Sequence, residues 1–366
     1  MKVGDKQYQS IWLNADDNRI INIIDQRLLP FEFKILSLET VEDVFYAIRD
    51  MALRGAPLIG VAGAFGMYLA ALEISNRSNP ADHLRNAARY LSSSRPTAVN
   101  LDWALKKQLE LVGRDDSKEI LVKKLLENAR NICAEEIEKC RLIGESGLPV
   151  IEKISRQKKE ETVNILTHCN AGWLACVDYG TATAPIYLAH DRGIKLHVWV
   201  DETRPRNQGA RLTAYELGEH GVPHTLITDN AGGYLMKKGM VDLVLVGSDR
   251  TGSQGDVANK TGTYLKALAA KDNNIPFYVA LPTSSIDRSI INAEDEIEIE
   301  ERDPEEVSHT EGYLEGEIVK VRLCPEQTKI SNFGFDITPA HLVSGLISEK
   351  GIVKASKEGI NSLFTE

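Results

Sequence analysis

The sequence predicts an α/β protein, in which a smaller, mostly helical N-terminal domain precedes a Rossmann-like domain built on a parallel sheet. Two observations lead to this fold class. After about Val150, apolar runs of strand length alternate with helical patterns, as they do in β-α-β units. Before that point, the stretch from Thr40 to about Leu148 is mostly helical in pattern. We therefore expect an N-terminal domain over residues 1–148, which also holds short β segments, and the Rossmann-like domain over residues 149–366.

The N-terminal elements follow from local composition. Thr40 is followed by Glu42 and Asp43, and acidic residues favour the N-terminus of a helix, so a helix is expected to begin there. Small residues dominate 60–75 and predict a tightly packed helix, whereas 116–140 is charged and amphipathic. Short β-type runs cover residues 8–13 and 20–24.

The C-terminal elements alternate between strand and helix. Strands are expected over residues 163–167, 196–200, 224–228, 243–247 and 276–280. Helices are expected between them over residues 181–191, 208–217, 231–238 and 259–271. Ligands of such sheets bind beyond the carboxyl ends of the strands, so the residues directly after each strand are the ones to inspect. The stretch 309–332 fits a β-hairpin, with Glu311-Gly312 and Glu315-Gly316 as turn signals.

Composition excludes several classes of function. The net charge of -10 argues against binding to a nucleic-acid backbone, which needs a concentrated positive surface. The sequence has no apolar run of membrane-spanning length and no secretory signal at its start, so neither a membrane partner nor secretion is expected. The number of cysteines is five, which is odd, and no two have C-x-x-C spacing. Disulfide frameworks and structural zinc sites are therefore poor interpretations, and a reducing cytoplasm fits best.

Polar and reactive residues follow four successive strands of the predicted sheet. These segments are His168-Cys169-Asn170-Ala171-Gly172, the stretch 201–209 with Gln208, Asp229-Asn230-Ala231-Gly232-Gly233, and Ser248-Asp249-Arg250 together with 255–262. Each segment alone has an ordinary structural explanation. Because parallel strands end at one edge of the sheet, the shared position of these segments predicts a functional site there.

An anion site is one interpretation of the last of these segments. Residues 255–261 partly resemble the phosphate-binding pattern G-x-x-x-x-G-K-[ST], but the segment is one residue short and Asn259 replaces the glycine before Lys260. No G-x-G-x-x-G occurs, so a dinucleotide cofactor is unsupported. What remains is a polar turn that opens a helix, with Lys260 beside the helix N-terminus, where an anion is favoured. An ordinary helix cap with a solvated lysine would give the same pattern.

Two arginines in the N-terminal region are further candidates for binding an anion. Arg54 precedes Gly55-Ala56-Pro57, and Arg95 precedes a proline in a Ser-rich turn. Glycine and proline beside an arginine let the backbone approach a ligand closely. Each arginine alone is more often a solvated or salt-bridged surface group, and sequence spacing cannot bring the two together.

Cys169 and Asp249 are the candidate reactive groups. A thiol at a strand-to-helix turn has its pKa lowered by the helix N-terminus, although a free cysteine is more often buried and inert. A pair of Cys169 with His168 is disfavoured, because adjacent residues at a strand end point in opposite directions. Asp249 follows a fully apolar strand, so partial desolvation would raise its pKa into the range useful for proton transfer. The alternatives for Asp249 are a helix cap or a pair with Arg250.

Eight segments together resemble one known family, the methylthioribose-1-phosphate isomerases, and they run in that family's order across nearly the whole chain. The segments are Arg54-Gly55-Ala56-Pro57, the stretch 95–100, Thr167 to Gly172, Asp201 to Pro205, Gln208-Gly209-Ala210, Gly255 to Lys260, Glu301 to Val307 and Phe335 to Ala340. The family lies in a superfamily that also contains ribose-1,5-bisphosphate isomerases and the regulatory subunits of a translation-initiation exchange factor.

The resemblance implies an aldose-ketose isomerase of methionine salvage, converting 5-methylthioribose 1-phosphate to 5-methylthioribulose 1-phosphate. It implies a cytoplasmic homodimer without metal or organic cofactor, whose site lies between the two domains. Asp249 matches the family's proton donor and Cys169 its second catalytic residue. The matched substrate-binding positions are Arg54, Gly55, Ala56, Arg95, Gln208, Asn259 and Lys260.

Departures from the family pattern leave the substrate's 5-substituent open. Ser248 replaces the usual alanine before Asp249, the loop 251–254 differs, and Asp102 takes a place often held by an apolar or aromatic residue. The 5-deoxy sugar phosphate is therefore a second substrate to test. A ribose-1,5-bisphosphate isomerase would need a second phosphate pocket, and the sequence shows no extra basic motif for one. A regulatory subunit need not keep the Cys and Asp pair, which this chain has.

Overall fold

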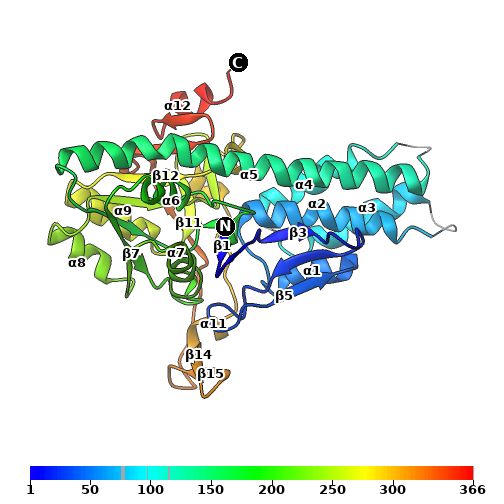
Figure 1. Cartoon of the computed structure of the whole chain (residues 1–366), viewed down its shortest axis with the longest axis horizontal. Helices are drawn as coiled ribbons and strands as arrows, with labels where there is room; N and C mark the ends of the chain where they lie inside the picture. Colours follow the sequence, from blue (N-terminus) through cyan, green and yellow to red (C-terminus); the bar gives the residue numbers. More distant parts are fainter. Residues whose placement is uncertain (76–78, 97, 114–115, 366) are drawn as a thin grey trace.

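The computed structural model of the protein describes residues 1–75, 79–96, 98–113 and 116–365. Thr97, which belongs to the turn at 95–100, lies outside these residues. One helix, α5 (Lys118–Gln157), spans the long axis of the molecule (Figure 1). The N-terminal helices lie along one half of α5, and the largest sheet lies along the other half.

The N-terminal part combines a small antiparallel sheet with four helices. The sheet has the order β3-β4-β5, and two short strands, β1 (Lys2–Val3) and β2 (Lys6–Gln7), pair with each other. The elements are β3 (Ile11–Leu13), β4 (Ile21–Ile24), β5 (Ile35–Leu38), α1 (Val41–Arg49), α2 (Ala56–Leu72), α3 (Pro80–Ser92) and α4 (Val99–Leu109). Thr40 and Asp43 form a capping box at the start of α1, which confirms the expected helix start.

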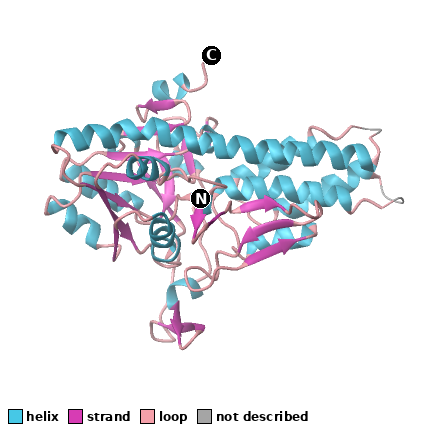
Figure 2. Ribbon diagram, viewed as in Figure 1, coloured by secondary structure: helices cyan, strands magenta, loops and turns pink. Residues whose placement is uncertain are grey.

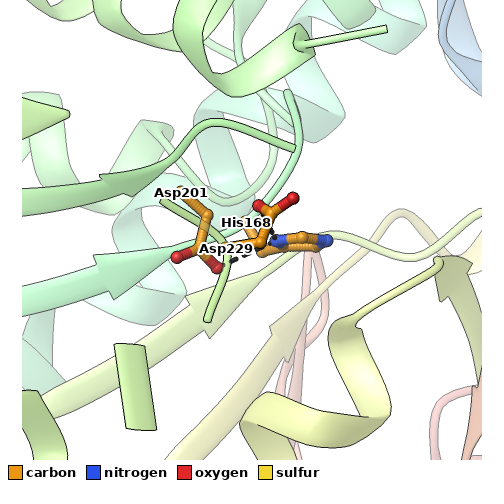
Figure 3. A group of neighbouring side chains, drawn as sticks. All are labelled: His168, Asp201 and Asp229. Atoms are coloured by element: carbon orange, nitrogen blue, oxygen red, sulfur yellow. Dashed lines mark hydrogen bonds and ion pairs between the residues drawn. The ribbon is translucent and has the colours of Figure 1, made fainter. Parts of the chain in front are cut away.

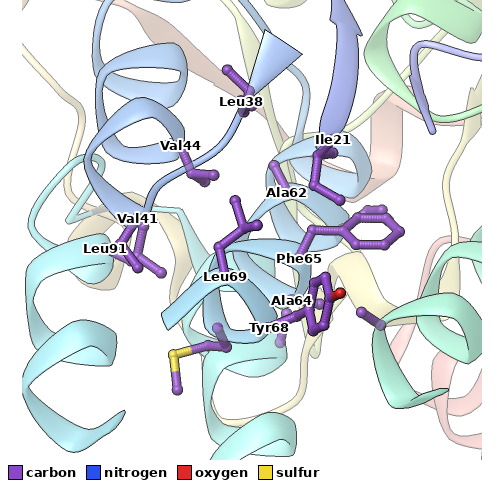
Figure 4. Packing of buried hydrophobic residues seen from close by; sticks show 14 of the residues in the cluster. Ile21, Leu38, Val41, Val44, Ala62, Ala64, Phe65, Tyr68, Leu69 and Leu91 are labelled. Carbon is purple, nitrogen blue, oxygen red and sulfur yellow. The ribbon is translucent and has the colours of Figure 1, made fainter. Parts of the chain in front are cut away.

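Helix α2 is the centre of the N-terminal core. It is apolar on all sides, and nearly all of its residues are buried, as expected for a helix enclosed by others. Figure 4 shows Phe65 and Leu69 of α2 packed with Val41 and Val44 of α1 and with Leu91 of α3. This packing holds the N-terminus of α2, and the Arg54-Gly55 segment before it, in a fixed place.

The largest sheet confirms the predicted fold class. Its order is β18-β17-β12-β9-β6-β7-β8, and every neighbouring pair is parallel except β17 with β18. Its strands are β6 (Val163–Thr167), β7 (Leu196–Asp201), β8 (His224–Ile227), β9 (Leu243–Val246), β12 (Phe277–Ala280), β17 (Gly345–Ser348) and β18 (Gly351–Val353).

Helices cover both faces of this sheet (Figure 2). Ile165 and Leu245 belong to one core, which also contains residues of α5 and α6, whereas Leu166 and Val244 belong to another, which contains residues of α8 and α9. Alternate residues of each strand therefore pack on opposite faces. The helices are α6 (Ala184–Asp191), α7 (Ala214–His220), α8 (Ala231–Lys237), α9 (Thr263–Asp272) and α12 (Lys357–Ser362).

A second sheet corrects one expected helix. Its order is β13-β10-β11-β16, formed by β13 (Ile286–Asp287), β10 (Arg250–Gly252), β11 (Val257–Lys260) and β16 (Phe335–Thr338). The helix expected over residues 259–271 begins only at Thr263, because the backbone of 257–260 pairs with β10 and β16. Asp336 accepts hydrogen bonds from the backbone N–H groups of Gly262 and Tyr264, so a carboxylate already occupies the start of α9.

The stretch 309–332 contains the expected hairpin, which projects from the body of the molecule (Figure 1). Strands β14 (His309–Leu314) and β15 (Glu317–Arg322) pair in antiparallel register, with Glu315 and Gly316 at positive φ in the turn. The turn signal at Glu311-Gly312 was wrong, because both residues lie inside β14. The short helices α10 (Ala293–Glu296) and α11 (Glu305–Ser308) precede the hairpin.

Helix α5 connects the two halves of the molecule without a break. Its Leu121 and Leu125 pack in the N-terminal core, and its Ile143 and Ile151 pack in a core of the large sheet. The chain division expected after residue 148 falls inside this helix and stays a prediction. Among the described helices, none combines the length and the apolar character needed to cross a membrane.

Candidate active site

The strand order of the large sheet reverses between β6 and β9. From β6 the chain proceeds outward to β7 and β8, and from β9 it proceeds outward in the other direction to β12 and β17. A ligand of a doubly wound sheet binds at such a reversal, beyond the carboxyl ends of the two strands. Cys169 follows β6 closely and Asp249 follows β9 closely, so the two candidate reactive groups come from the two strands that flank the reversal.

One cavity of about 430 Å³ lies at this point, between the sheet edge and the N-terminal helices. All nine residues singled out from the sequence line it, namely Arg54, Gly55, Ala56, Arg95, Cys169, Gln208, Asp249, Asn259 and Lys260. The structure therefore brings together side chains that are up to 206 residues apart in the sequence, as from Arg54 to Lys260.

Cys169 is held in an unusual backbone conformation. Its φ is +65°, in the left-handed region that L-residues seldom adopt. Two buried threonines hold it there: the Thr203 hydroxyl accepts the Cys169 N–H at 2.8 Å, and the Thr213 hydroxyl donates to its carbonyl at 2.7 Å. The expected helix N-terminus is not what sets the thiol pKa, because only a three-residue turn of 3₁₀ helix, Trp173–Ala175, follows. Burial instead raises the pKa of Cys169, while Arg54 and Lys260 oppose this rise.

Asp249 lies between β9 and β10, and its backbone N–H donates to the carbonyl of Ala258 at 3.0 Å. Burial raises the pKa of its carboxyl group above the ordinary value of 3.8, as expected, although Lys260, Arg54 and Arg95 act against this. Arg250 does not pair with Asp249 but with Asp287. Asp249 is thus an acid that keeps its proton to higher pH than an exposed aspartate.

Lys260 projects from a strand and not from a helix N-terminus, which corrects the interpretation made from the sequence. Its ammonium group is buried, donates to the carbonyl of Gly334 at 2.8 Å, and lies 5.0 Å from the ring centre of Phe335. Burial lowers the pKa of Lys260, whereas Cys169 and Asp249 raise it. The thiol, the carboxyl group and the ammonium group therefore act on one another electrostatically across the cavity.

Two amide side chains complete this wall of the cavity. Asn259 donates to the hydroxyl of Thr263 at 3.0 Å, and its neighbouring residues are fixed by β-pairing. Gln208 precedes a π-helical turn, Gly209–Thr213, and the buried Oε1 of Gln208 has no hydrogen-bond partner within the described residues. A buried acceptor without a partner is costly, so it indicates a ligand that donates a hydrogen bond.

The opposite wall is the start of α2. Gly55 has a φ of +107° and lies against the backbone of Ala175, where a Cβ would come within 2.2 Å of the carbonyl oxygen. No side chain caps the helix, and Pro57 stands in its first turn. The free N–H groups at the start of a long helix attract anions. Arg54, directly before Gly55, donates to the side chain and to the carbonyl of Asn170.

The guanidinium group of Arg95 is a buried positive charge that has few hydrogen-bond or ionic partners. Its Nε and Nη1 are buried and have no hydrogen-bond partner among the described residues. Glu300 is the carboxylate paired with it, at 4.0 Å, and burial lowers the pKa of Arg95. A guanidinium group in this state is suited to a bidentate anion such as a phosphate group.

Comparisons with known proteins agree with this geometry. Residues 52–355 match the model of the Initiation factor 2 subunit family. The chain belongs to this family.

Relatives in the family resemble the chain over its full length. A methylthioribose-1-phosphate isomerase of Desulfatibacillum aliphaticivorans is 56% identical over 100% of this chain and 99% of its own. One of Sinorhizobium medicae is 55% identical over 100% of both chains. The resemblance indicated by the eight segments is thereby confirmed.

Two solved structures in the family share the fold. The crystal structure of 5-methylthioribose 1-phosphate isomerase from Pyrococcus horikoshii has a TM-score of 0.86 and 38% identity, covering 98% of this chain and 96% of its own. That of the translation initiation factor eIF-2B subunit delta from A. fulgidus has a TM-score of 0.80 and 37% identity, covering 98% and 99%. The family's fold thus occurs both under an enzyme name and under the name of a translation initiation factor subunit.

His168, Asp201 and Asp229 form a cluster of neighbouring side chains, of which the first two are buried (Figure 3). His168 Nδ1 lies 2.9 Å from Asp201 and 3.9 Å from Asp229, and potential ligand atoms of these three residues lie within 4.8 Å of one another. The ammonium group of Lys266 contacts the carboxylate of Asp201 at 3.1 Å, so a positive charge already lies beside this carboxylate. His168 Nε2 lies 2.9 Å from the carbonyl of Thr261, so the imidazole links the Cys169 loop to the strand of Lys260. Both ring nitrogens of His168 therefore have partners other than the Cys169 thiol.

Several cavity residues were missed from the sequence. Arg302 and Phe335 line the cavity and belong to segments that carried the family resemblance, so a signal for them was present. Arg302 is bound by Glu300 and Glu306. Asn170 also lines the cavity, and it belongs to the segment from Thr167 to Gly172 that carried the resemblance.

Proposed function

We propose that this chain is an aldose-ketose isomerase that converts 5-methylthioribose 1-phosphate to 5-methylthioribulose 1-phosphate in methionine salvage. One observation carries the proposal: Cys169 and Asp249 leave the two strands at the reversal of the sheet and line one cavity with a set of anion-binding groups. Full-length relatives with the corresponding name support the same activity.

The phosphate group has a suitable place between the two walls. The uncapped start of α2 at Gly55 and Ala56, the buried guanidinium group of Arg95 and the ammonium group of Lys260 all border the cavity. Holding the phosphate at several points keeps it attached to C1 while the ring opens. Gln208 and Asn259 are the proposed partners of the sugar hydroxyl groups.

Asp249 is the proposed acid for ring opening. The anomeric carbon of the substrate carries the phosphate, so C1 becomes reactive only when the bond to the ring oxygen breaks and that oxygen takes a proton. Burial raises the pKa of Asp249, which favours the protonated form that a general acid needs. The hydrogen on C2 is then transferred to C1, either as a hydride or as a proton that is removed and returned. The C2 hydroxyl loses its proton as it becomes the ketone, which balances the proton taken up by the ring oxygen, and the phosphate ester stays on C1. We propose that Cys169 lies against C1 and C2 and takes part in this transfer of hydrogen.

The rest of the cavity suits an apolar 5-substituent. Ile59, Val99, Pro282 and Ile297 are among its lining residues. A methylthio group would bury apolar surface here, and the same surface limits access of water that could hydrolyse the phosphate.

Ribose 1,5-bisphosphate is the less suitable substrate. A second phosphate group would need further free cations, but Arg302 is neutralised by Glu300 and Glu306, and Arg250 by Asp287. In the part of the chain that the structure describes, the cavity therefore has enough free positive charge for one phosphate group.

A coupled assay with purified protein tests the proposal. We expect turnover of 5-methylthioribose 1-phosphate, weaker turnover of 5-deoxyribose 1-phosphate, and little or none of ribose 1,5-bisphosphate. Preference for the bisphosphate would replace the proposal with the alternative isomerase. Absence of turnover with all three would favour a regulatory subunit, for which the relative titled as a translation factor subunit is the precedent.

We also propose that the enzyme acts in the cytoplasm as a homodimer. Free cysteines at five positions fit a reducing compartment. Exposed apolar residues on adjacent helices α8 and α9, among them Tyr234, Leu265 and Leu268, supply a surface for a second copy. Light scattering on the purified chain tests the dimer, and a monomeric mass at micromolar concentration would contradict it.

A further inference from the structure

Glu216 is a fully buried glutamate in α7 that lies behind the cavity wall. Its Oε1 accepts hydrogen bonds from the backbone N–H of Leu174 at 2.8 Å and from Asn170 Nδ2 at 3.1 Å. Its Oε2 accepts one from the hydroxyl of Tyr187 at 3.1 Å. Burial raises the pKa of Glu216 to about 7, so the fold maintains a costly carboxyl group at this position.

The neighbours of Asn170 determine which way its amide group faces. Asn170 Nδ2 donates both to Glu216 Oε1 and to the hydroxyl of Thr213, at 3.1 Å each. Because both acceptors lie on the nitrogen side, Oδ1 faces the other way, toward Arg54. Arg54 Nη1 donates to this Oδ1 at 2.5 Å, and Nη2 donates to the backbone carbonyl of Asn170 at 2.6 Å. A flipped amide would place its NH₂ group against the guanidinium group.

The loop that carries Cys169 is shaped around the same carboxylate. A Cβ at Gly172 would lie 1.6 Å from Glu216 Oε2, so the close approach of loop and carboxylate requires glycine there. Thr213, which shares the amide of Asn170 with Glu216, also holds the carbonyl of Cys169. Thr213 and Glu216 thus fix Cys169 on one side of the cavity and, through Asn170, Arg54 on the other side.

We propose that Glu216 is a positioning residue for the reaction: it orients the amide of Asn170, which in turn seats Arg54 at the start of α2 for binding the substrate phosphate. Glu216 itself does not line the cavity. The inference rests on the proposed function for the identity of the ligand, but the orientation of Asn170 and Arg54 can be tested without it.

Glu216→Leu removes both acceptor oxygens while keeping an apolar side chain in the buried site. We expect the KM for 5-methylthioribose 1-phosphate to rise at least about tenfold, with kcat changed less, because Asn170 no longer holds Arg54 in position. Glu216→Gln keeps an acceptor for Asn170, so the KM of this variant should stay within about threefold of the parent value. In an Arg54→Ala background, Glu216→Leu should raise KM no further, as expected for two residues acting through one contact.

Glu136→Leu is the matched control, because Glu136 is a similarly buried glutamate in α5 that does not line the cavity. It should leave KM unchanged. The proposal is wrong if folded Glu216→Leu keeps the parent KM, or if it raises KM equally with and without Arg54. If Glu216→Leu does not fold, Glu216→Asp, which withdraws the carboxylate by one methylene group, should give the same pattern.

A crystal structure of Glu216→Leu, or of Glu216→Asp, separates this inference from the proposed function. We expect the Arg54 guanidinium group to leave Asn170 in the variant, whatever substrate the protein turns over. An Arg54–Asn170 contact unchanged from the parent would overturn the positioning role even if the isomerase assay succeeds. A displaced Arg54 in a protein without isomerase activity would uphold the positioning role and reject only the proposed substrate.

Discussion

The two walls of the cavity hold their functional groups in different ways. On the sheet side, hydrogen bonds fix the backbone of each reactive residue: threonine hydroxyls hold Cys169, and main-chain partners in β11 and β16 hold Asp249 and Lys260. On the helical side, Arg54 depends on side-chain contacts with Asn170, and Arg95 has two buried nitrogens without a partner. We therefore propose a division of roles, in which the sheet side supplies the reacting groups together with Lys260, and the helical side supplies the rest of the anion site. Variants of the two walls should then separate into effects on kcat and effects on KM.

The largest effects are expected on the sheet side. Cys169→Ser and Asp249→Asn should each lower kcat by about two to four decades, because each removes a group that we propose to contact the reacting carbons or the ring oxygen. KM should stay within about threefold of the parent. Steady-state kinetics measure both.

The pH profile sharpens this assignment for Asp249. Its raised pKa means that the protonated acid persists to higher pH than usual, and the rate should fall as pH rises through that pKa. Asp249→Asn should lack this alkaline limb. A limb that survives unchanged in the variant would belong to another group.

Behind the two walls, the buried carboxyl group of Glu216 should affect stability. Its pKa is raised from 4.5 unfolded to about 7 folded, so the folded state binds the extra proton. Stability from this group is full below pH 4.5 and declines as pH rises to about 7, by about 3 kcal/mol in all. Denaturant unfolding across this range should show Glu216→Gln gaining stability relative to the parent with rising pH. A constant difference would contradict the raised pKa.

On the helical side, Arg95→Met should weaken binding without weakening the fold. Removing the guanidinium group should raise KM at least about tenfold while kcat changes little. The free protein should unfold at the same temperature or higher, since a buried and poorly paired charge is gone. Loss of stability together with loss of binding would show that Arg95 is structural.

The smallest effect concerns the 5-substituent. Replacing the methylthio group by hydrogen removes apolar surface near Ile59, Val99 and Ile297, and should lower kcat/KM by about tenfold. Equal values for the two substrates would place the 5-position outside this apolar region.

The same two walls differ in how far the sequence could predict them. The strand ends were predictable, because apolar runs mark the strands and parallel strands end at one edge, which places Cys169 and Asp249 together. Arg54 and Arg95 were candidates only, since no periodicity in the sequence brings an N-terminal turn to a distant sheet edge.

Other features depend on tertiary contacts that local sequence does not record. Lys260 was assigned to a helix start because Thr263 does begin a helix, and the competing β-pairing comes from β16, more than 70 residues away. The sequence holds no local signal for Glu216, because the hydrogen bonds on which its proposed role depends come from Asn170 and Leu174, in another part of the chain.

A crystal structure with bound 5-methylthioribulose 1-phosphate tests the central claim most directly, which is that one thiol and one carboxyl group act on the same sugar. We expect Cys169 Sγ and an Asp249 carboxylate oxygen both to lie within about 4 Å of C1, C2 or the oxygen on C4, with the phosphate at the start of α2. A product bound with either group more than about 6 Å from those atoms would contradict the proposed chemistry.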